Sequence, residues 1–128
     1  MRAIAVAAAL LCAPLFCASA HAQRYVPSGG SVKLTFFCNI NPDCSASGLP
    51  TVRITKQPEH GRVSVSQTRD FCYFQPSNPR NVCNNRRVSG VGVRYTAQRG
   101  YTGYDSVGAE VFFPSGSMRS GTYSINVR

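Results

Sequence analysis

The sequence contains no tryptophan, and only five of its 128 residues are acidic, against 14 lysines and arginines. Histidine is also scarce, with two residues. Metal sites and general acid–base catalysis draw mainly on His, Asp and Glu, so the chain has few groups for either chemistry. A chain of this length has room for one hydrophobic core, which excludes a multidomain assembly and a large cofactor-dependent enzyme.

Sequence motifs for nucleotide binding and nucleophilic catalysis are also missing. Neither G-x-x-x-x-G-K-[ST] nor G-x-G-x-x-G occurs, and no serine lies in a nucleophile-elbow glycine motif. Beyond the N-terminal segment His60 is the single histidine, and we interpret it as a turn residue, although triads assemble in space and a triad with Ser and Asp is the alternative. We therefore expect no enzymatic activity and no cofactor.

The longest apolar run lies at the N-terminus, in residues 3–16. It is too short for a membrane span, which needs roughly 20 residues. The following Ala20-His21-Ala22 has the small-x-small pattern of a signal-peptidase site. Residues 1–22 are therefore predicted to be a secretory signal cleaved after Ala22, with cleavage after Ala20 as the alternative, and the mature protein is expected in the periplasm or outside the cell.

Four cysteines remain after cleavage: Cys38, Cys44, Cys72 and Cys83. An even number of cysteines in a small exported domain indicates two disulfides, for which three pairings are possible. We favour Cys38–Cys44 and Cys72–Cys83, because each pair brackets a polar stretch with Pro and Asn where the chain can turn back. Neither spacing fits a common zinc knuckle, so no metal is expected.

Apolar residues alternate with polar ones at a period of two along most of the mature chain, whereas no stretch has the 3.6-residue period of an amphipathic helix. This pattern predicts an all-β domain. The expected strands centre on residues 32–36, 52–54, 63–65, 71–74, 91–95, 107–113 and 123–127, with Gly92 and Arg94 facing outward and Phe112 opposite to Val111.

Short segments rich in Pro, Gly, Asn and Ser separate these strands. About seven short strands with this spacing predict a two-layer β-sandwich over residues 31–128, preceded by a flexible lead-in over residues 23–30. An up-and-down barrel or an oligonucleotide-binding barrel is the alternative, because the pattern locates strands better than it pairs them.

Two segments resemble bacterial immunoglobulin-like, cadherin-like extracellular modules. Residues 58–63, Pro-Glu-His-Gly-Arg-Val, match their P-x-H-G-x-V turn and strand. The signature Y-T-P-x-x-x-[FY]-x-G-x-D-x-[FV] is matched by Tyr95, Thr96, Tyr101, Gly103, Asp105 and Val107. With the closing strand, the resemblance covers roughly residues 50–128, and it implies an immunoglobulin-like Greek-key sandwich, stapled here by disulfides, that serves as a spacer or adhesive unit.

The resemblance also implies roles for individual residues. Gly61 and Gly103 are expected at tight turns that favour positive φ, and Asp105 is expected to bond a backbone amide at a strand start. Tyr101 is expected to pack beneath its loop. The sequence departs from the family in having Ala97 in place of proline, a single copy of the module and four cysteines. The carboxylates are scattered, so calcium binding is not expected.

Basic residues are the most suggestive feature of the mature chain. With Arg2 removed, 13 basic and five acidic residues give a formal charge of +8. Several are predicted to face outward from strands, and others lie around Cys83. A cationic surface attracts anions, and arginine suits phosphate and carboxylate. The anion-binding candidates are Arg53, Arg62, Arg86, Arg87 and Arg94, and Lys33, Arg80 and Arg128 belong to the same basic set.

An exposed tyrosine offers a different kind of contact, and Tyr104 is the candidate for binding a partner. The sequence therefore predicts an exported, monomeric, non-enzymatic immunoglobulin-like domain that acts as a binding or structural accessory module. The alternative is a cationic binder of anionic polymers such as acidic glycan, lipopolysaccharide or nucleic acid, and a secreted enzyme inhibitor is a more distant option. The partner is thus an unknown protein or a polyanionic surface.

Overall fold

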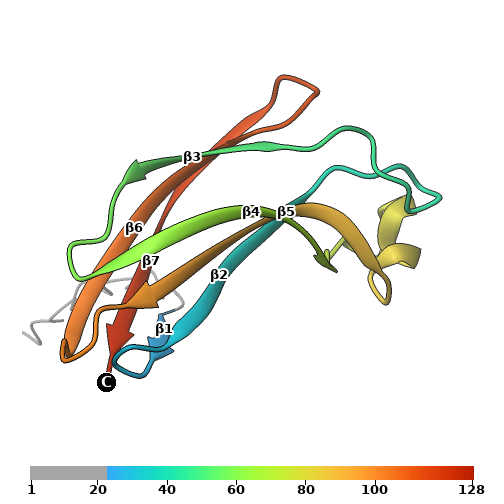
Figure 1. Ribbon diagram of the computed structural model, residues 1–128. Helices are drawn as coiled ribbons and strands as arrows, with labels where there is room; N and C mark the ends of the chain where they lie inside the picture. The colour runs from blue at the N-terminus through green and yellow to red at the C-terminus, as the bar shows by residue number, and fades with distance from the viewer. Residues whose placement is uncertain (1–22) are drawn as a thin grey trace, which may run out of the picture.

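The computed structural model describes residues 23–128, which form seven strands and one short 3-10 helix (Figure 1). The predicted signal segment, residues 1–22, lies outside the described residues. Among the residues that the structure does describe, none forms a helix long and apolar enough to cross a membrane. The elements are β1 (Arg24–Val26), β2 (Ser31–Cys38), β3 (Thr51–Lys56), β4 (Gly61–Phe71), η1 (Pro79–Cys83), β5 (Arg87–Ala97), β6 (Gly103–Phe112) and β7 (Met118–Val127).

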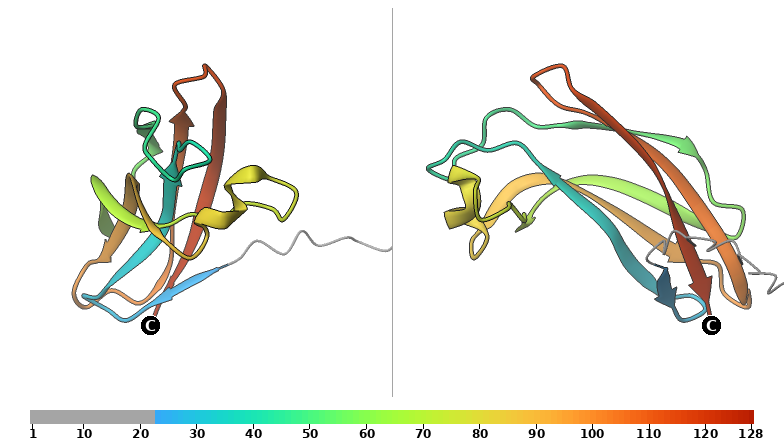
Figure 2. Two further views of the ribbon diagram at one scale, coloured as in Figure 1. Left: turned by 90° about the vertical axis from the view of Figure 1, so that its right-hand side faces the viewer. Right: turned by 180° about the vertical axis from the view of Figure 1, so that it is seen from behind.

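The strands form two sheets that pack face to face as an all-β sandwich (Figures 1 and 2). One sheet has the order β1-β7-β6-β3, and the other has the order β2-β5-β4. All neighbours are antiparallel except β1 and β7, which run parallel. The all-β prediction is thus confirmed, and the chain connects the two sheets three times between β2 and β6.

Inward-facing residues of both sheets form the main core. The alternating pattern points every second side chain of each strand to the same side, so Val93 and Tyr95 of β5 face Val107 of β6 and Ile125 of β7. All four are fully buried. A second, smaller core lies at one end of the molecule, where Ile40, Cys83 and Val88 are buried against aromatic rings and the disulfides.

The disulfides connect Cys38 to Cys72 and Cys44 to Cys83, with Cα–Cα distances of 6.5 and 5.6 Å. The predicted existence of two disulfides is confirmed, but the predicted pairing, Cys38–Cys44 and Cys72–Cys83, is wrong. Strands β2 and β4 are both antiparallel to β5, so they run in the same direction and end at the same end of the sheet. The chain segments at that end therefore lie side by side. One disulfide joins the last residue of β2 to the segment after β4, and the other joins the loop after β2 to that segment.

A strand expected over residues 71–74 is also wrong. Strand β4 begins at Gly61 and continues without interruption to Phe71, and residues 72–74 that follow it form no strand. Cys72 and Phe74 are apolar because they pack on the second core, not because they alternate across a sheet. Phe74 is held there by backbone hydrogen bonds with the side chain of Asn84.

The segment before β2 is more ordered than the expected flexible lead-in. Residues 24–26 form β1, and Val26 is buried in the main core. The strand is only three residues long and precedes Pro27, so its alternation is too short to recognise. Backbone hydrogen bonds from Arg128 to Val26 and from Ser28 to Arg128 extend its pairing with β7.

Candidate functional site

Three of the predicted outward-facing basic residues share the outer face of the β2-β5-β4 sheet. Lys33 and Arg94 are directly opposite each other in the pairing of β2 with β5. Arg62 of β4 pairs with Thr96, two residues from Arg94 on the same side of β5. The buried neighbours of these residues point into the core, so the pleat directs all three cationic side chains to solvent.

A glycine forms part of the floor of this face. Gly92 precedes Arg94 by two residues and is buried, and a Cβ atom there would lie 3.2 Å from Thr68 Cγ2. Without a side chain at this position, the surface is hollow between the longer side chains of the neighbouring strands. The hollow has a volume of about 250 Å³ and is lined by Lys33, Ser66, Thr68, Arg69, Asp70, Arg87, Gly92, Val93 and Arg94.

One carboxylate lies among these cations. Asp70 Oδ2 accepts a hydrogen bond of 2.7 Å from Lys33 Nζ. That bond is the main cause of a lowered pKa for Asp70, and a backbone hydrogen bond from Phe71 and the charge of Arg87 act in the same direction. Asp70 is therefore ionised at neutral pH and holds the Lys33 ammonium in place, while Arg94 has no acidic partner among the described residues.

The charge imbalance persists over the whole described surface. Thirteen of the 14 lysines and arginines fall within residues 23–128, and of these only Lys33 and Arg53 form ion pairs with carboxylates in that part of the chain. Eleven cationic side chains therefore have no carboxylate within 4.0 Å in residues 23–128. Such a surface has a positive potential that extends into solution at low ionic strength.

Of the remaining candidate arginines, Arg87 lines the same hollow, whereas Arg53 and Arg86 do not join this face. Arg53 lies on the other sheet, paired with Glu110 of β6. Arg87 begins β5 with its guanidinium 5.1 Å from the centre of the Phe71 ring, and Arg86 is exposed in the preceding turn. Arg80 donates to the carbonyl oxygen of Ile40, which gives it a structural role in the η1 loop.

Arg69 and Asp70 were not among the predicted site residues. Both lie on the second half of β4, beyond the strand expected around residues 63–65, where polar residues hide the strand pattern. The positions on the same side of β4 as Val63 and Val65 continue as Gln67, Arg69 and Phe71. The first two are polar, so the apolar pattern is interrupted until Phe71.

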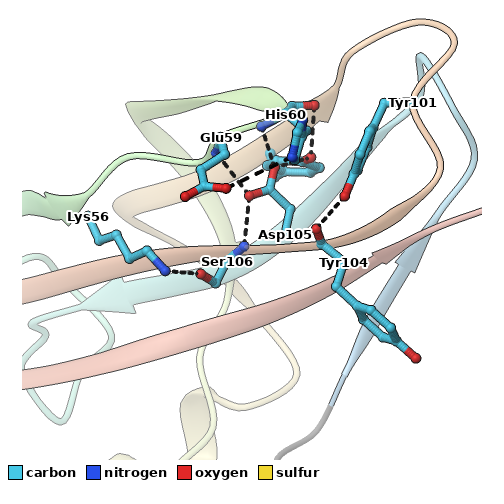
Figure 3. Close-up of polar contacts among 8 residues, drawn as sticks. Lys56, Glu59, His60, Tyr101, Tyr104, Asp105 and Ser106 are labelled. Atoms are coloured by element: carbon cyan, nitrogen blue, oxygen red, sulfur yellow. Dashed lines mark hydrogen bonds and ion pairs between the residues drawn. The ribbon is translucent and has the colours of Figure 1, made fainter.

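A second polar cluster surrounds Asp105 at the start of β6 (Figure 3). Its carboxylate accepts hydrogen bonds from the backbone amides of Glu59, His60 and Ser106 and from the Tyr95 hydroxyl, at 2.8 to 3.0 Å. Burial raises the pKa of this carboxyl, but the hydrogen bonds lower it by more, and the net pKa lies below its ordinary value. Asp105 thus anchors the turn before β4 to the start of β6.

No family model, curated protein or solved structure matches this chain. Within residues 23–128, no group of three or more His, Cys, Asp or Glu side chains is placed to hold a metal ion.

The ring of His60 stacks on Tyr101, with ring centres 3.8 Å apart and planes inclined by 8°. The Tyr101 hydroxyl donates to the carbonyl oxygen of Tyr104, so Tyr101 packs against its own loop. Gly103 has the expected positive φ, at 131°. Gly61 does not; it is required because a Cβ atom there would lie 2.7 Å from the Tyr95 ring.

Proposed function

We propose that this protein is an exported immunoglobulin-like binding module that recognises an anionic polymer outside the cytoplasm. The proposed contact surface is the outer face of the β2-β5-β4 sheet. The observation that carries the proposal is the opposed pair Lys33 and Arg94 beside a hollow with a glycine floor, with Arg62 on the same face.

The order of the strands supports an immunoglobulin-like Greek key. The hairpins β4-β5 and β6-β7 lie in different sheets, and β3 joins the β6-β7 sheet although it precedes β4 in the chain. The residues that resemble the cadherin-like modules also meet in space. Tyr95 and Asp105 of the downstream signature contact each other and the backbone of the turn at His60, which belongs to the upstream motif.

Export is supported by two independent features. Residues 1–22 have the pattern of a secretory signal, and the four cysteines beyond it are joined in two disulfides. Structural disulfides persist in oxidising compartments such as the periplasm and the extracellular medium. A module exported in this way meets acidic glycans and phosphorylated lipopolysaccharide, both of which are polyanions.

The chemistry of the face suits phosphate, sulfate or carboxylate groups. A guanidinium has a planar set of donors that matches two oxygens of such a group. Within residues 23–128, Arg62 and Arg94 have no carboxylate partner, whereas the Lys33 ammonium is already paired with Asp70. Arg62 and Arg94 lie on neighbouring strands of one sheet, so they can contact successive anionic groups of a chain. Most of the affinity would come from charge and would depend strongly on salt concentration.

A second candidate function is a protein-binding accessory module, and a different surface favours it. Phe71, Tyr73 and Val82 expose 49, 73 and 68% of their surface at the end of the molecule that carries the disulfides. Phe71 and Tyr73 line a hollow of about 720 Å³ together with further aromatic rings, including Phe37 and Phe113. Exposed apolar clusters of this kind are common at protein interfaces.

Retention on heparin and DNA columns across a salt gradient tests the anionic-polymer proposal. The wild-type mature protein should be retained at low salt and eluted as salt rises. The double variant Arg62→Glu/Arg94→Glu should elute much earlier. Arg119→Glu on β7 changes the net charge in the same direction outside the proposed face, so it serves as the control, with circular dichroism to verify folding. The proposal would be contradicted if Arg119→Glu lowered the salt concentration of elution by as much, per unit of charge changed, as the double variant does.

A further inference from the structure

Two exposed tyrosines lie in one row across the other sheet. Strand β7 lies between β1 and β6, and the pairing places Asn126 opposite both Tyr25 of β1 and Tyr104 of β6. Tyr25 and Tyr104 expose 52 and 70% of their surface. The row therefore has an aromatic ring at each end and an amide in the middle.

All three side chains point to the outer face of the sheet. Their chain neighbours Val26, Ile125 and Asp105 are buried between the sheets, and successive residues of a strand point to opposite sides. The row crosses two strand spacings, so the backbones that carry Tyr25 and Tyr104 are about 9–10 Å apart across the sheet.

Neighbouring groups restrain both tyrosines. The guanidinium carbon of Arg128 lies 4.2 Å from the centre of the Tyr25 ring. The backbone of Tyr104 is fixed by the hydrogen bond from the Tyr101 hydroxyl, and the Tyr104 ring points away from the Asp105 cluster into open space (Figure 3). A tyrosine side chain has only two rotatable bonds, so a ring on a fixed backbone loses little conformational freedom when a ligand binds.

The surface next to Tyr104 is polar but carries little net charge. A hollow of about 330 Å³ adjoins the ring and is lined by Gln23, Lys56, Glu59, Tyr104, Asp105, Ser106 and Ser124. The carboxylate of Asp105 already accepts hydrogen bonds from its neighbours. The exposed charged groups of this hollow are then Lys56 and Glu59, which lie among hydroxyl and amide groups. A ligand rich in hydroxyl groups finds both donors and acceptors here.

We propose that the row of Tyr25, Asn126 and Tyr104 binds a β-1,4-linked polysaccharide that lies across the strands. The C–H groups on the face of a pyranose ring are weakly positive and stack on the electron-rich face of tyrosine. In a β-1,4-linked chain, every second sugar presents the same face, and the spacing of the two strands that carry the tyrosines is close to the length of that disaccharide repeat. The sugar between them faces the Asn126 amide.

This site is independent of the cationic face, because it lies on the outer side of the other sheet. A protein partner fits the row less well, since the positions around it are Ser106, Ser124 and Asn126 and offer no aliphatic side chain to bury. The row thus supplies a second contact for a glycan, with the charge of Arg128 at its Tyr25 end.

Isothermal titration with soluble hexasaccharides tests this inference. Chitohexaose and cellohexaose are β-1,4-linked and should bind, whereas the α-linked maltohexaose should bind at least tenfold more weakly. Tyr25→Ala and Tyr104→Ala should each weaken binding at least tenfold, and Tyr104→Phe should retain it because the ring remains. Phe112→Ala removes an exposed ring at the other end of β6 and should leave the affinity unchanged.

Heparin retention separates this inference from the proposed function. The two tyrosine variants should still be retained on heparin, and the Arg62→Glu/Arg94→Glu variant should still bind the hexasaccharides. Absence of binding to both β-linked probes, or equal affinity in Tyr104→Ala and wild type, would overturn the polysaccharide site and leave the anionic-polymer proposal standing.

Discussion

The hydroxyl of Tyr95 donates a hydrogen bond of 2.8 Å to Asp105 Oδ2 across the interior of the sandwich. Tyr95 is fully buried on β5 of one sheet, and Asp105 is 9% exposed on β6 of the other. This contact joins the two sheets through a polar pair inside an otherwise apolar core. Because the same carboxylate also holds the turn before β4, a change at either residue should be felt in both sheets.

Tyr95→Phe should lower the free energy of unfolding by about 1–3 kcal/mol, because it removes one donor from a buried carboxylate without creating a cavity. Urea denaturation followed by circular dichroism measures the loss. Tyr104→Phe removes the same atom at the surface and should leave stability within about 0.5 kcal/mol of wild type. Equal losses in the two variants would show that the buried hydrogen bond has no special role.

Asp105→Asn should make stability less dependent on pH in the acid range. The folded pKa of Asp105 is below its ordinary value of 3.8, so the ionised carboxylate stabilises the fold fully above about pH 4, and this contribution is lost as pH falls through the folded pKa. The variant should be destabilised at pH 7, and its difference from wild type should shrink below pH 4. Urea unfolding at pH 7, 5 and 3 tests this, and a difference that does not change with pH would contradict it.

Removal of either disulfide should destabilise the protein strongly. The bonds Cys38–Cys72 and Cys44–Cys83 close loops of 34 and 39 residues, and restriction of the unfolded chain over such loops contributes about 3–4 kcal/mol each. Thermal unfolding of the two Cys→Ser double variants measures the losses.

Peptide mapping of the unreduced protein tests the pairing itself. Non-reducing digestion should yield one disulfide-linked peptide with Cys38 and Cys72 and another with Cys44 and Cys83. Recovery of Cys38 linked to Cys44 would mean that the two loops are not joined, and the second core would then lack its covalent support.

Gly90→Ala should destabilise the fold by about 1–3 kcal/mol, because an added methyl group would overlap the Phe37 carbonyl oxygen and the Phe36 ring. Gly121→Ala in β7 is the matched control, since nothing lies within 4 Å of a Cβ atom there and its φ is not positive. Chemical denaturation of the pair isolates the close contact at Gly90. A Gly90→Ala variant as stable as Gly121→Ala would show that Phe36 moves aside without loss.

The strands were predictable where apolar residues alternate with polar ones over several positions, as around Val107 and Val111. The alternation does not locate β1, which is too short, or the second half of β4, where polar residues occupy both faces. It also misleads at Phe71–Phe74, where apolar residues serve a separate core. These failures share a cause. A period-two apolar pattern marks the parts of a strand that pack on the main core, and it does not mark strands or apolar residues with other surroundings.

The candidate sites depend on which strands are neighbours, and a single strand pattern does not contain that information. Outward orientation was predictable for Arg53, Arg62 and Arg94, but Arg53 belongs to the other sheet. The row of Tyr25 and Tyr104 joins residues far apart in the chain through a parallel pairing that the sequence does not signal. The disulfide pairing was mispredicted for the same reason, since it follows from the shared direction of β2 and β4.

The parallel pairing of β1 with β7 also determines how the protein would respond to mechanical force. If residues 23 and 128 were pulled apart, the load would act along these two strands in opposite directions, and their hydrogen bonds would be sheared together instead of being opened one at a time. The disulfides would prevent the chain between Cys38 and Cys83 from extending fully even after the sheets separated. Under such a load, the pairing of β1 with β7 would be the contact that resists first.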